Sequence, residues 1–371
     1  MNLFKKMFGN GVTDEQRSAI ENALRHVEVP YGERVLAEVG ELKSARFKKG
    51  VLALTLALPF PAKSLWPRLT AQLESTLHQA GFEQVTIEWQ TDIETREVQA
   101  GVKPLQGVKN IIAVGSGKGG VGKSTTAVNL ALALAQEGAR VGILDADIYG
   151  PSLPTMLGVS QRPQSEDGQH MQPIDALGIK AMSIGFLIDE DTPMIWRGPL
   201  VTQTLVQLLN ETQWGELDYL VIDLPPGTGD VQLTLAQQIP VSGAVVVTTP
   251  QKVALVDAKK AIAMFDKVKI TTLGMIENMS THVCSCCGCE EAIFGASGGE
   301  ALAQEKGIPL LGKLPLDKRI CADMDAGKPT VIAEPTSTLA QRYHEIAIKV
   351  GVRLAEKKKE YRQLFPEIVV K

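Results

Sequence analysis

The stretch that decides the fold is Asn110–Gly115, followed one residue later by Gly117-Lys118-Gly119-Gly120-Val121-Gly122-Lys123-Ser124. The first part is apolar and predicts a strand, and the second has the G-x-x-x-x-G-K-S spacing of a phosphate-binding loop (P-loop). A helix is predicted directly afterwards, over Ser124–Glu137. Glycines let backbone N–H groups close around phosphate oxygens, and the helix start adds its positive end. This stretch therefore predicts a nucleotide-binding α/β domain.

Further strands and helices alternate downstream of the P-loop. Four more short runs are almost wholly apolar: Arg140–Asp145, Tyr219–Asp223, Ala244–Thr248 and Leu273–Ile276. Strands this apolar are typical of a parallel sheet that helices cover on both faces. The last long helix is predicted over Thr336–Lys357. We therefore expect a mainly parallel P-loop domain over residues 110–357, followed by a tail over 358–371.

Residues 11–91 predict a small α+β domain of order αββαβ. Thr13, with Gln16 three residues later, is a helix-capping pattern, and the helix is expected to run to about Val27. The segments expected after it are an extended stretch, a strand, a helix and a strand: Arg34–Lys48, Val51–Leu58, Ala62–Ala80 and Phe82–Gln90. Val51–Leu58 carries leucine at every second position, which indicates one buried face. Residues 92–109 are polar without periodicity and are predicted to be a linker.

Composition narrows the class of protein. The chain has 371 residues, 44% of them hydrophobic, which suits one large and one small domain. A net charge of −4 with both signs interspersed gives no reason to expect nucleic acid or an acidic membrane surface as a partner. The five cysteines are clustered rather than paired, which favours a reducing compartment. Without a secretory pattern in Met1–Asn10 or a run of roughly 20 apolar residues, we expect a cytoplasmic protein.

Acidic residues follow two of the predicted strands. Asp223 ends one of them and is expected to reach Mg²⁺ together with Ser124, while Lys123 is expected to reach the β- and γ-phosphates. The glycines of the next segment, Leu224–Asp230, suit a loop that senses the γ-phosphate. Asp145 and Asp147 follow another strand, where a carboxylate can hold a magnesium-bound water or orient the attacking water. For Asp145 two roles remain open: it supports the carboxylate that contacts magnesium or the water, or it caps the end of the strand.

Four of the five cysteines lie in Cys284-Ser285-Cys286-Cys287-Gly288-Cys289. Thiolates bind zinc, or iron in sulfide clusters. Structural zinc usually takes two separated pairs of ligands, whereas the two CxxC pairs here overlap, and His282 and Cys321 are the other candidates nearby. One CxxC per chain supplies four ligands when two chains meet, which is the number that a 4Fe–4S cluster needs. A zinc knuckle remains a less favoured alternative.

Lys118 gives the P-loop a second lysine. The run Lys-Gly-Gly-Val-Gly-Lys-Ser resembles the deviant Walker A loop of the family containing MinD, ParA and the nitrogenase iron protein. In that family this lysine crosses a dimer interface to the partner's nucleotide, which implies a homodimer; a solvated loop lysine is the alternative. The resemblance also implies that Asp147 positions the attacking water and that Asn278 contacts adenine, although an ordinary turn asparagine is the competing interpretation. The catalytic residues implied are Lys118, Lys123 and Asp147, and the nucleotide contacts are Gly117, Lys118, Gly119, Gly120, Val121, Gly122, Lys123, Ser124, Thr125, Asp223 and Asn278.

A closer resemblance follows from the cysteines. Glu277-Asn278-Met279-Ser280, followed by Cys284-x-x-Cys287-Gly288, resembles the signature of the Mrp/ApbC iron–sulfur carrier ATPases. Three further segments look like that family's: Asp145–Ser152, Trp196–Pro199 and Asp223–Asp230. The similarity covers about residues 107–355, and the N-terminal domain resembles the family's accessory domain, which elsewhere is a separate iron–sulfur assembly protein.

The chain departs from this family at two places. The accessory domain often carries a cysteine where this chain has Leu58–Ala62, so we expect that domain to bind no metal. Cys286 and Cys289 are additional to the family's CxxC, and either they ligate transiently or they are spare. Cys321 falls in a predicted helix and is expected to be a small buried residue.

The resemblance implies an ATP-hydrolysing homodimer that carries a 4Fe–4S cluster on Cys284 and Cys287 of each chain. ATP, Mg²⁺ at Ser124 and the cluster are the expected cofactors, and scaffold proteins and apoproteins are the expected partners. Two other functions remain open. One is a positioning switch like MinD or ParA, which would not need the cysteines, and Glu356–Lys371 does not look membrane-seeking because Phe365-Pro366 breaks a helix. The other is an electron-transfer ATPase like the nitrogenase iron protein, whose cluster stays in place.

Overall fold

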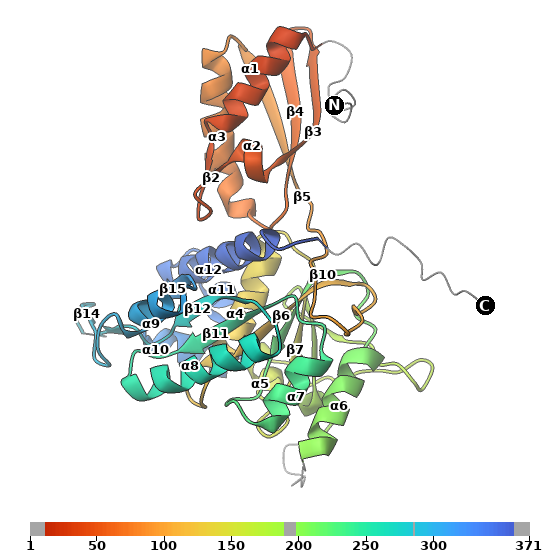
Figure 1. The fold of residues 1–371 in the computed structure, drawn as a ribbon, viewed down its shortest axis with the longest axis vertical. Helices are drawn as coiled ribbons and strands as arrows, with labels where there is room; N and C mark the ends of the chain where they lie inside the picture. The colour runs from red at the N-terminus through yellow and green to blue at the C-terminus, as the bar shows by residue number, and fades with distance from the viewer. Residues whose placement is uncertain (1–11, 189–197, 285, 360–371) are drawn as a thin grey trace.

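The structure is a computed structural model that describes residues 12–188, 198–284 and 286–359. The expectations placed on Met1–Asn10, Trp196-Arg197 and Phe365-Pro366 therefore lie outside the described residues. Figure 1 shows a small N-terminal part, red to orange, standing on a larger part. Across the described ranges, no helix combines the length and the apolar character needed to cross a membrane.

The larger part contains a central eight-stranded sheet. Its strands in chain order are β6 (Val108–Gly115), β7 (Val141–Asp145), β8 (Ile174–Ala176), β9 (Ile179–Ser183), β10 (Leu217–Asp223), β11 (Gly243–Thr248), β12 (Thr272–Glu277) and β15 (Leu310–Lys313). Their spatial order is β15-β12-β11-β6-β10-β7-β9-β8, and only the β8–β9 pair is antiparallel. Every residue of β10 and β11 is buried, as their apolar sequences predict. The expected mainly parallel sheet is confirmed, although β8, β9 and β15 were not predicted.

Helices cover both faces of this sheet. One hydrophobic cluster packs α4 (Lys123–Gln136), α5 (Leu153–Leu157), α10 (Lys318–Asp325), α11 (Thr330–Ala333) and α12 (Thr338–Ala355) on one face. A second cluster packs α6 (Gly198–Glu211), α7 (Asp230–Gln238), α8 (Lys252–Lys267) and α9 (Gly298–Lys306) on the other. A short 3-10 helix (Ile184–Phe186) contributes to both clusters. The predicted fold class, a sheet between two helical layers, is therefore confirmed.

The N-terminal part is a three-stranded sheet with helices on one side. Its elements are α1 (Asp14–Arg25), β1 (Glu28–Val29), β2 (Arg34–Val35), α2 (Leu36–Val39), β3 (Glu41–Lys48), β4 (Val51–Leu58), a 3-10 helix (Lys63–Leu65), α3 (Trp66–Gln79) and β5 (Gln84–Thr91). β4 lies in the middle, antiparallel to β3 and parallel to β5. The capping pair Thr13 and Gln16 forms as predicted. The expectation of one extended stretch over Arg34–Lys48 was wrong, because α2 interrupts it to bury Leu36 in the core.

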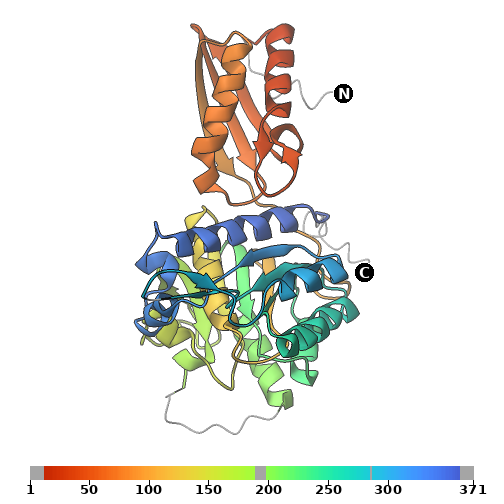
Figure 2. The same cartoon turned by 90° about the vertical axis from the view of Figure 1, so that its left-hand side faces the viewer.

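The N-terminal part docks on the ends of α4 and α12, which Figures 1 and 2 show beneath it in yellow and blue. Ile348 and Val352 of α12 belong to the same hydrophobic cluster as the leucines of β4. A Cβ at Gly351 would lie 3.0 Å from Pro61 Cδ, so this glycine permits the close approach. Glu137, 1% exposed after α4, accepts a 2.8 Å hydrogen bond from the Ser64 N–H. The interface therefore combines apolar packing with a buried carboxylate.

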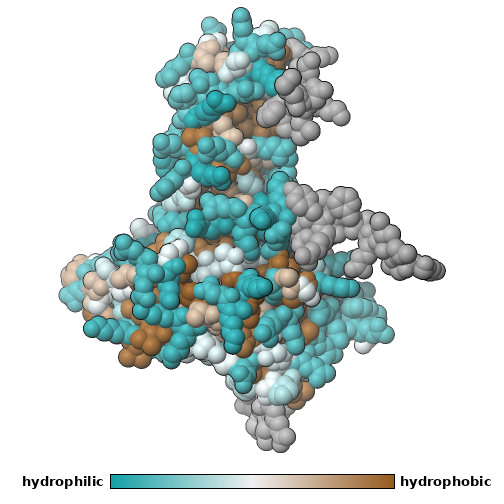
Figure 3. Space-filling view, viewed as in Figure 1, coloured by the Kyte–Doolittle hydropathy of each residue, from teal (hydrophilic) through white to brown (hydrophobic). Residues whose placement is uncertain are grey.

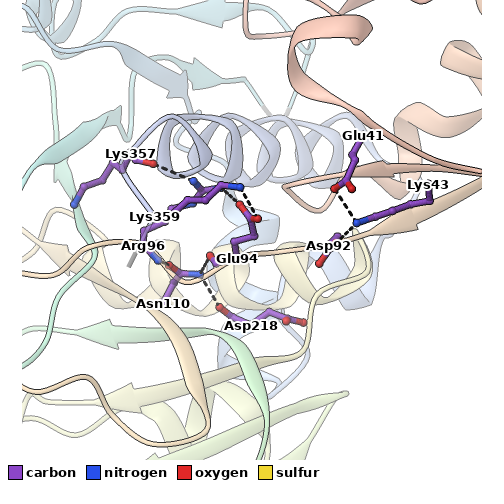
Figure 4. Close-up of polar contacts among 9 residues, drawn as sticks. All are labelled: Glu41, Lys43, Asp92, Glu94, Arg96, Asn110, Asp218, Lys357 and Lys359. Atoms are coloured by element: carbon purple, nitrogen blue, oxygen red, sulfur yellow. Dashed lines mark hydrogen bonds and ion pairs between the residues drawn. The ribbon is translucent and has the colours of Figure 1, made fainter. Parts of the chain in front are cut away.

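The segment between the two parts is held in place (Figure 4). The Arg96 side chain is 5% exposed and pairs with Glu94 at 3.3 Å. Its backbone N–H donates to Asn110 Oδ1 at 3.0 Å, and its guanidinium donates to the Lys357 carbonyl at 3.0 Å. Lys359 pairs with Glu94 at 2.7 Å and forms a β-bridge with Arg96. The predicted linker is thus clamped by residues that follow α12.

Candidate nucleotide site and cysteine hairpin

Three neighbouring strands bring their carboxyl ends together at the candidate nucleotide site. β6 lies between β11 and β10, and β7 follows β10. The P-loop follows β6, Asp223 ends β10 and Asp145 ends β7; these two aspartates are register partners. Ligands of open α/β sheets bind outside this edge. The fold therefore assembles the residues that the sequence separates by about a hundred positions.

Glycines are required in the P-loop for two different physical reasons. A Cβ at Gly117 would lie 2.1 Å from the backbone carbon of Asp257 in α8, so no side chain fits there. Gly120 and Gly122 have φ of 77° and 78°, which L side chains rarely adopt. The Ser116 hydroxyl donates to the Lys118 carbonyl at 2.9 Å and fixes the loop's entry. The loop thus keeps a backbone shape suited to anions, with Lys118 partly exposed on it.

Lys123 is at the centre of the site. Its side chain is 6% exposed, and its ammonium group contacts both the Asp223 carboxylate and, at 3.2 Å, the Ser124 hydroxyl. Asp223 itself is 3% exposed. Hydroxyl and carboxylate oxygens are the ligands that Mg²⁺ prefers, so Ser124 and Asp223 fit a magnesium ion. Thr125 lies beside Ser124 in the first turn of α4 and is partly exposed.

Asp145 organises the loop that follows β7. One carboxylate oxygen accepts from the Asp147 N–H at 3.0 Å, and the other accepts from the N–H groups of Ser152 and Leu153 at 3.1 and 3.2 Å and from the Ser183 hydroxyl at 3.1 Å. Burial, reinforced by the Asp223 charge, raises the pKa of Asp145 to about 7. This geometry fits both open alternatives, because the carboxylate caps the end of β7 and also holds the Asp147 N–H.

Asp147 has a different environment from Asp145. It is only partly buried and lies in the loop that Asp145 holds. Burial raises its pKa, and the positive charge of Lys123 opposes that rise. A carboxylate with a raised pKa is a better proton acceptor. The charges of Lys123 and Asp223 both act on this carboxylate, so Asp147 lies near the P-loop residues.

The glycine-rich loop after β10 is tied to the P-loop. The Leu224 N–H donates to the Val114 carbonyl, and the Gly227 N–H donates to the Ser116 carbonyl, both at 3.0 Å. Gln232 of α7 donates to the Pro226 carbonyl at 2.6 Å. Sequence reasoning did not single out Ser116 or Gln232, because only the folded chain shows their partners. Through the loop, these bonds connect α7 to Ser116, the residue before the P-loop.

Asn278 contacts the P-loop directly. Its side-chain N–H donates to the Val121 carbonyl at 2.9 Å, and its backbone N–H donates to the Thr248 carbonyl at 2.7 Å. The side chain is largely buried, and a Cβ at Gly122 would lie 2.2 Å from its Nδ2. The predicted adenine contact is not tested by this geometry. Asn278 does, however, link the end of β12 to the phosphate-binding backbone.

The cysteines lie on a short hairpin that projects from the end of β12. Its strands are β13 (His282–Val283) and β14 (Glu290–Glu291), which Figure 1 shows at the left edge of the larger part. The Cys284 N–H donates to the Cys289 carbonyl at 2.9 Å, and the Gly288 N–H donates to the Cys284 carbonyl at 2.8 Å. Cys284 is partly buried, whereas the side chains of Cys286, Cys287 and Cys289 are exposed.

The thiols of the hairpin differ from one another in acidity. The Cys289 backbone N–H lowers the pKa of Cys287, while hydrogen bonding with Cys287 raises that of Cys289. Thiolates, not thiols, bind metals, so Cys287 is the better prepared of the two.

Residues at and just after the end of β12 hold the chain on both sides of the hairpin. Before it, the N–H and hydroxyl of Ser280 both donate to the Leu314 carbonyl, at 2.9 and 3.0 Å. After it, the Glu277 carboxylate accepts the Gly299 N–H at 2.6 Å, at the start of α9. Glu277 is 1% exposed. The segment that carries Asn278 therefore also fixes the base of the cysteine hairpin.

One expectation about cysteine was wrong. Cys321 lies in α10 as predicted, but it is exposed, because Ile320 and Met324 form the buried side of that short helix. Its thiol faces the Asp325 carboxylate at 3.5 Å instead. Within the described residues, no three His, Cys, Asp or Glu side chains gather closely enough to hold a metal ion, and His282 does not join the cysteines.

Comparison with known proteins agrees with this geometry. Residues 107–351 match the ParA family model described as NUBPL iron-transfer P-loop NTPase, and residues 17–89 match an iron–sulfur cluster assembly protein family. Proteins curated as iron–sulfur cluster carrier proteins from Haemophilus influenzae and Escherichia coli are each 49% identical, covering 94% and 91% of this chain and 94% and 92% of theirs. A solved nucleotide-binding protein in complex with ADP from Archaeoglobus fulgidus is 38% identical, with a TM-score of 0.54 over 62% of this chain and 90% of that one. The resemblance inferred from the motifs is confirmed, and this chain belongs to the ParA/NUBPL family of iron-transfer P-loop NTPases.

Proposed function

We propose that this chain is an ATP-hydrolysing carrier of iron–sulfur clusters that works as a homodimer. It would receive its cargo from scaffold proteins and deliver it to apoproteins, as the carrier function of its curated relatives suggests. One observation supports the proposal most directly. Asn278, which holds the P-loop carbonyl of Val121, lies in the segment that anchors the cysteine hairpin. A nucleotide site and a thiol site are thus joined within one short stretch of chain.

We propose a distinct task for each residue of the nucleotide site. Lys123 would bind the β- and γ-phosphates, for which its ammonium group is already placed beside Ser124 and Asp223. Mg²⁺, held by Ser124 and Asp223, would supply positive charge to the phosphates. Asp147 would orient the attacking water, as its raised pKa favours. The backbone N–H groups of Gly117–Thr125 would contact the phosphate oxygens.

The dimer is proposed from Lys118 and from the distribution of exposed apolar side chains. Tyr149, Val253, Val256 and Ile293 are 60%, 68%, 54% and 50% exposed, and all four lie in segments that follow the carboxyl ends of the parallel strands. In Figure 3, brown atoms gather at the lower left, where Figure 1 places α8, the helix that carries both valines. Burying them against a second copy would bring Lys118 toward the partner's nucleotide. A Lys118→Ala variant should then lose ATP turnover while still binding ATP.

The cargo site is proposed to be completed only in the dimer. Cys284 and Cys287 of each protomer would supply two thiolates, and two protomers would supply the four that a 4Fe–4S cluster needs. The exposure of Cys287 suits a site that must face another chain and later release its cargo. Cys286 and Cys289 are not required by this scheme.

Nucleotide and cargo are proposed to communicate through Asn278. A shift of Val121 when phosphate binds or leaves would act on Asn278, and the next residue, Met279, has a φ of 54°, which is uncommon for a residue with a side chain. Ser280 then starts the anchored base of the hairpin. If a Lys123→Ala variant transferred its cluster to an apoprotein at the wild-type rate, this coupling would be excluded.

Anaerobic purification tests the carrier function. The protein should contain iron and sulfide, show the absorption of a 4Fe–4S cluster, and elute as a dimer whose cluster is lost in Cys284→Ser or Cys287→Ser. Labelled iron should then appear in an acceptor apoprotein. A colourless protein that holds zinc after reconstitution would overturn the proposal. A cluster that cycles electrons but stays in place would indicate an electron-transfer ATPase instead.

A further inference from the structure

The cysteine hairpin has few contacts of its own to keep it in position. β13 and β14 pair over only two residues each, His282 with Glu291 and Val283 with Glu290. A two-stranded hairpin of this size is marginal by itself in water. Its first strand is held by the segment that follows β15, since the Leu316 N–H donates to the Thr281 carbonyl at 2.6 Å and the Val283 N–H donates to the Leu316 carbonyl at 3.4 Å. The position of its second strand must therefore depend on contacts with the body of the domain.

A hollow separates this hairpin from α12. The hollow has a volume of about 400 Å³ and is lined by Thr281 and Glu290 from the hairpin, by Gly312 and Lys313 from β15, and by Arg342 and Lys349 from α12. Side chains do not pack across this space, and the contact that spans it is polar. Glu290 reaches across and pairs with Arg342 at 3.3 Å. Its other carboxylate oxygen accepts from the Thr281 hydroxyl at 3.0 Å.

Arg342 is held at the same time by the body of the domain. Its second guanidinium nitrogen donates to the Lys313 carbonyl at 3.5 Å. About two and three turns farther along α12, Ile348 and Val352 join the core of the N-terminal domain. One helix therefore contacts the cysteine hairpin near its start and the N-terminal domain near its end.

We propose that Arg342 is a positioning residue for the cluster: through Glu290 it fixes the second strand of the cysteine hairpin against α12. The effect on the cluster rests on the proposed carrier function, whereas the contacts of Arg342 with Glu290 and Lys313 do not. With Arg342 removed, the hairpin keeps its link to β12 but samples more positions over the hollow. Cys284 and Cys287 then meet their partner thiolates less often, and the cluster is released faster.

The nucleotide site makes no use of this pair. Among the described residues, neither Glu290 nor Arg342 forms a hydrogen bond or ion pair with the P-loop, Asp147 or Asp223. Exposed ion pairs change equilibria by at most a few-fold. We therefore expect a two- to fivefold effect confined to the hairpin, with ATP turnover unchanged.

Arg342→Gln is the test variant, and Arg353→Gln is its matched control. Arg353 lies on the same helix and forms a similar exposed pair, 3.0 Å from Glu356, but is remote from the hairpin. In cluster-free protein, hydrogen exchange of the Cys284 and Gly288 amides and alkylation of the Cys284 thiol should become two- to fivefold faster in Arg342→Gln only. In cluster-loaded protein, cluster loss to an iron chelator should accelerate by the same factor. The reciprocal swap, Arg342→Glu with Glu290→Arg, should restore the wild-type rates.

The outcomes separate this inference from the proposed function. If Arg342→Gln and Arg353→Gln give the same exchange and alkylation rates, Arg342 does not position the hairpin. If exchange accelerates in Arg342→Gln but the wild-type protein never acquires a cluster, the positioning role stands and the carrier function fails. If the swap variant exchanges as fast as Arg342→Gln, the pairing with Glu290 is not the cause.

Discussion

Replacing Asn278 by alanine tests how the nucleotide and cysteine sites are joined. The family resemblance predicts that this amide contacts adenine, whereas the structure places its N–H on the Val121 carbonyl at 2.9 Å. These two interpretations differ in which ligands the variant should lose. An adenine contact affects ATP alone. Support of the P-loop affects every ligand that the loop binds, including inorganic tripolyphosphate.

The magnitude follows from the burial of the bond. Val121 is 2% exposed, so removing the Asn278 amide leaves a carbonyl without its partner and away from water. An unsatisfied buried polar group costs roughly 1–3 kcal/mol. In the free variant the P-loop would leave its binding conformation to hydrate this carbonyl, and ligand binding would have to restore that conformation. Because every 1.4 kcal/mol is tenfold, ATP and tripolyphosphate should each bind up to about 150-fold more weakly. The main-chain bond from Asn278 to Thr248 is retained, so the fold itself should survive.

Calorimetric titration with ATP and with tripolyphosphate measures both affinities. Asn210→Ala, at an exposed position of α6, is the control and should bind both ligands normally. Cluster transfer should slow in Asn278→Ala and stay normal in the control. Weaker ATP binding with unchanged tripolyphosphate binding would refute the P-loop role and favour the adenine contact. Unchanged binding of both would refute the two interpretations together.

Three further predictions concern other parts of the molecule. Glu137→Ala should weaken docking of the N-terminal domain by roughly 1.5–3 kcal/mol, because the buried charge-assisted hydrogen bond from the Ser64 N–H is lost. Faster proteolysis of residues 92–109 with unaltered ATP affinity would reveal the weaker docking. Asp145 has a pKa of about 7 in the folded protein and 3.8 in the unfolded chain, so between these pH values the folded protein retains a proton that the unfolded chain releases. The free energy of unfolding should therefore fall as pH rises through this range, by up to about 1.4 kcal/mol per pH unit. Unfolding free energies measured with urea at several pH values should depend less on pH in Asp145→Asn. The double variant Cys286→Ser with Cys289→Ser should keep the iron content of wild type, whereas Cys284→Ser should lose it; equal loss in both, by iron assay, would show that the additional thiols are ligands.

Local sequence patterns correctly predicted those helices and strands that are determined by neighbouring residues. The Thr13 and Gln16 capping pair started α1 as expected, and the alternating leucines of β4 face the core. The apolar runs of β10 and β11 became fully buried strands because helices cover both faces of the sheet. The P-loop spacing was equally informative, since its glycines are required by the backbone itself.

Features that depend on distant partners escaped prediction. No sequence pattern near Arg96 predicts that its side chain is buried, because the carbonyl that it binds belongs to Lys357, at the other end of the chain. Cys321 looked like a small core residue, yet an eight-residue helix with one buried side leaves it exposed. The contact of Asn278 with Val121 likewise appears only when β12 lies near the P-loop.

The place of α12 in both cores has a consequence for how the protein is made. Synthesis proceeds from the N-terminus, and domains generally fold in that order. The N-terminal domain has all its strands once β5 has left the ribosome, but Ile348 and Val352, which complete its core, come late in the chain. During synthesis the N-terminal domain therefore remains undocked until the whole sheet of the larger domain and α12 have been translated. Docking then occurs as a final step of assembly, so only a chain translated through α12 and the residues that clamp Arg96 attains the arrangement shown in Figure 1.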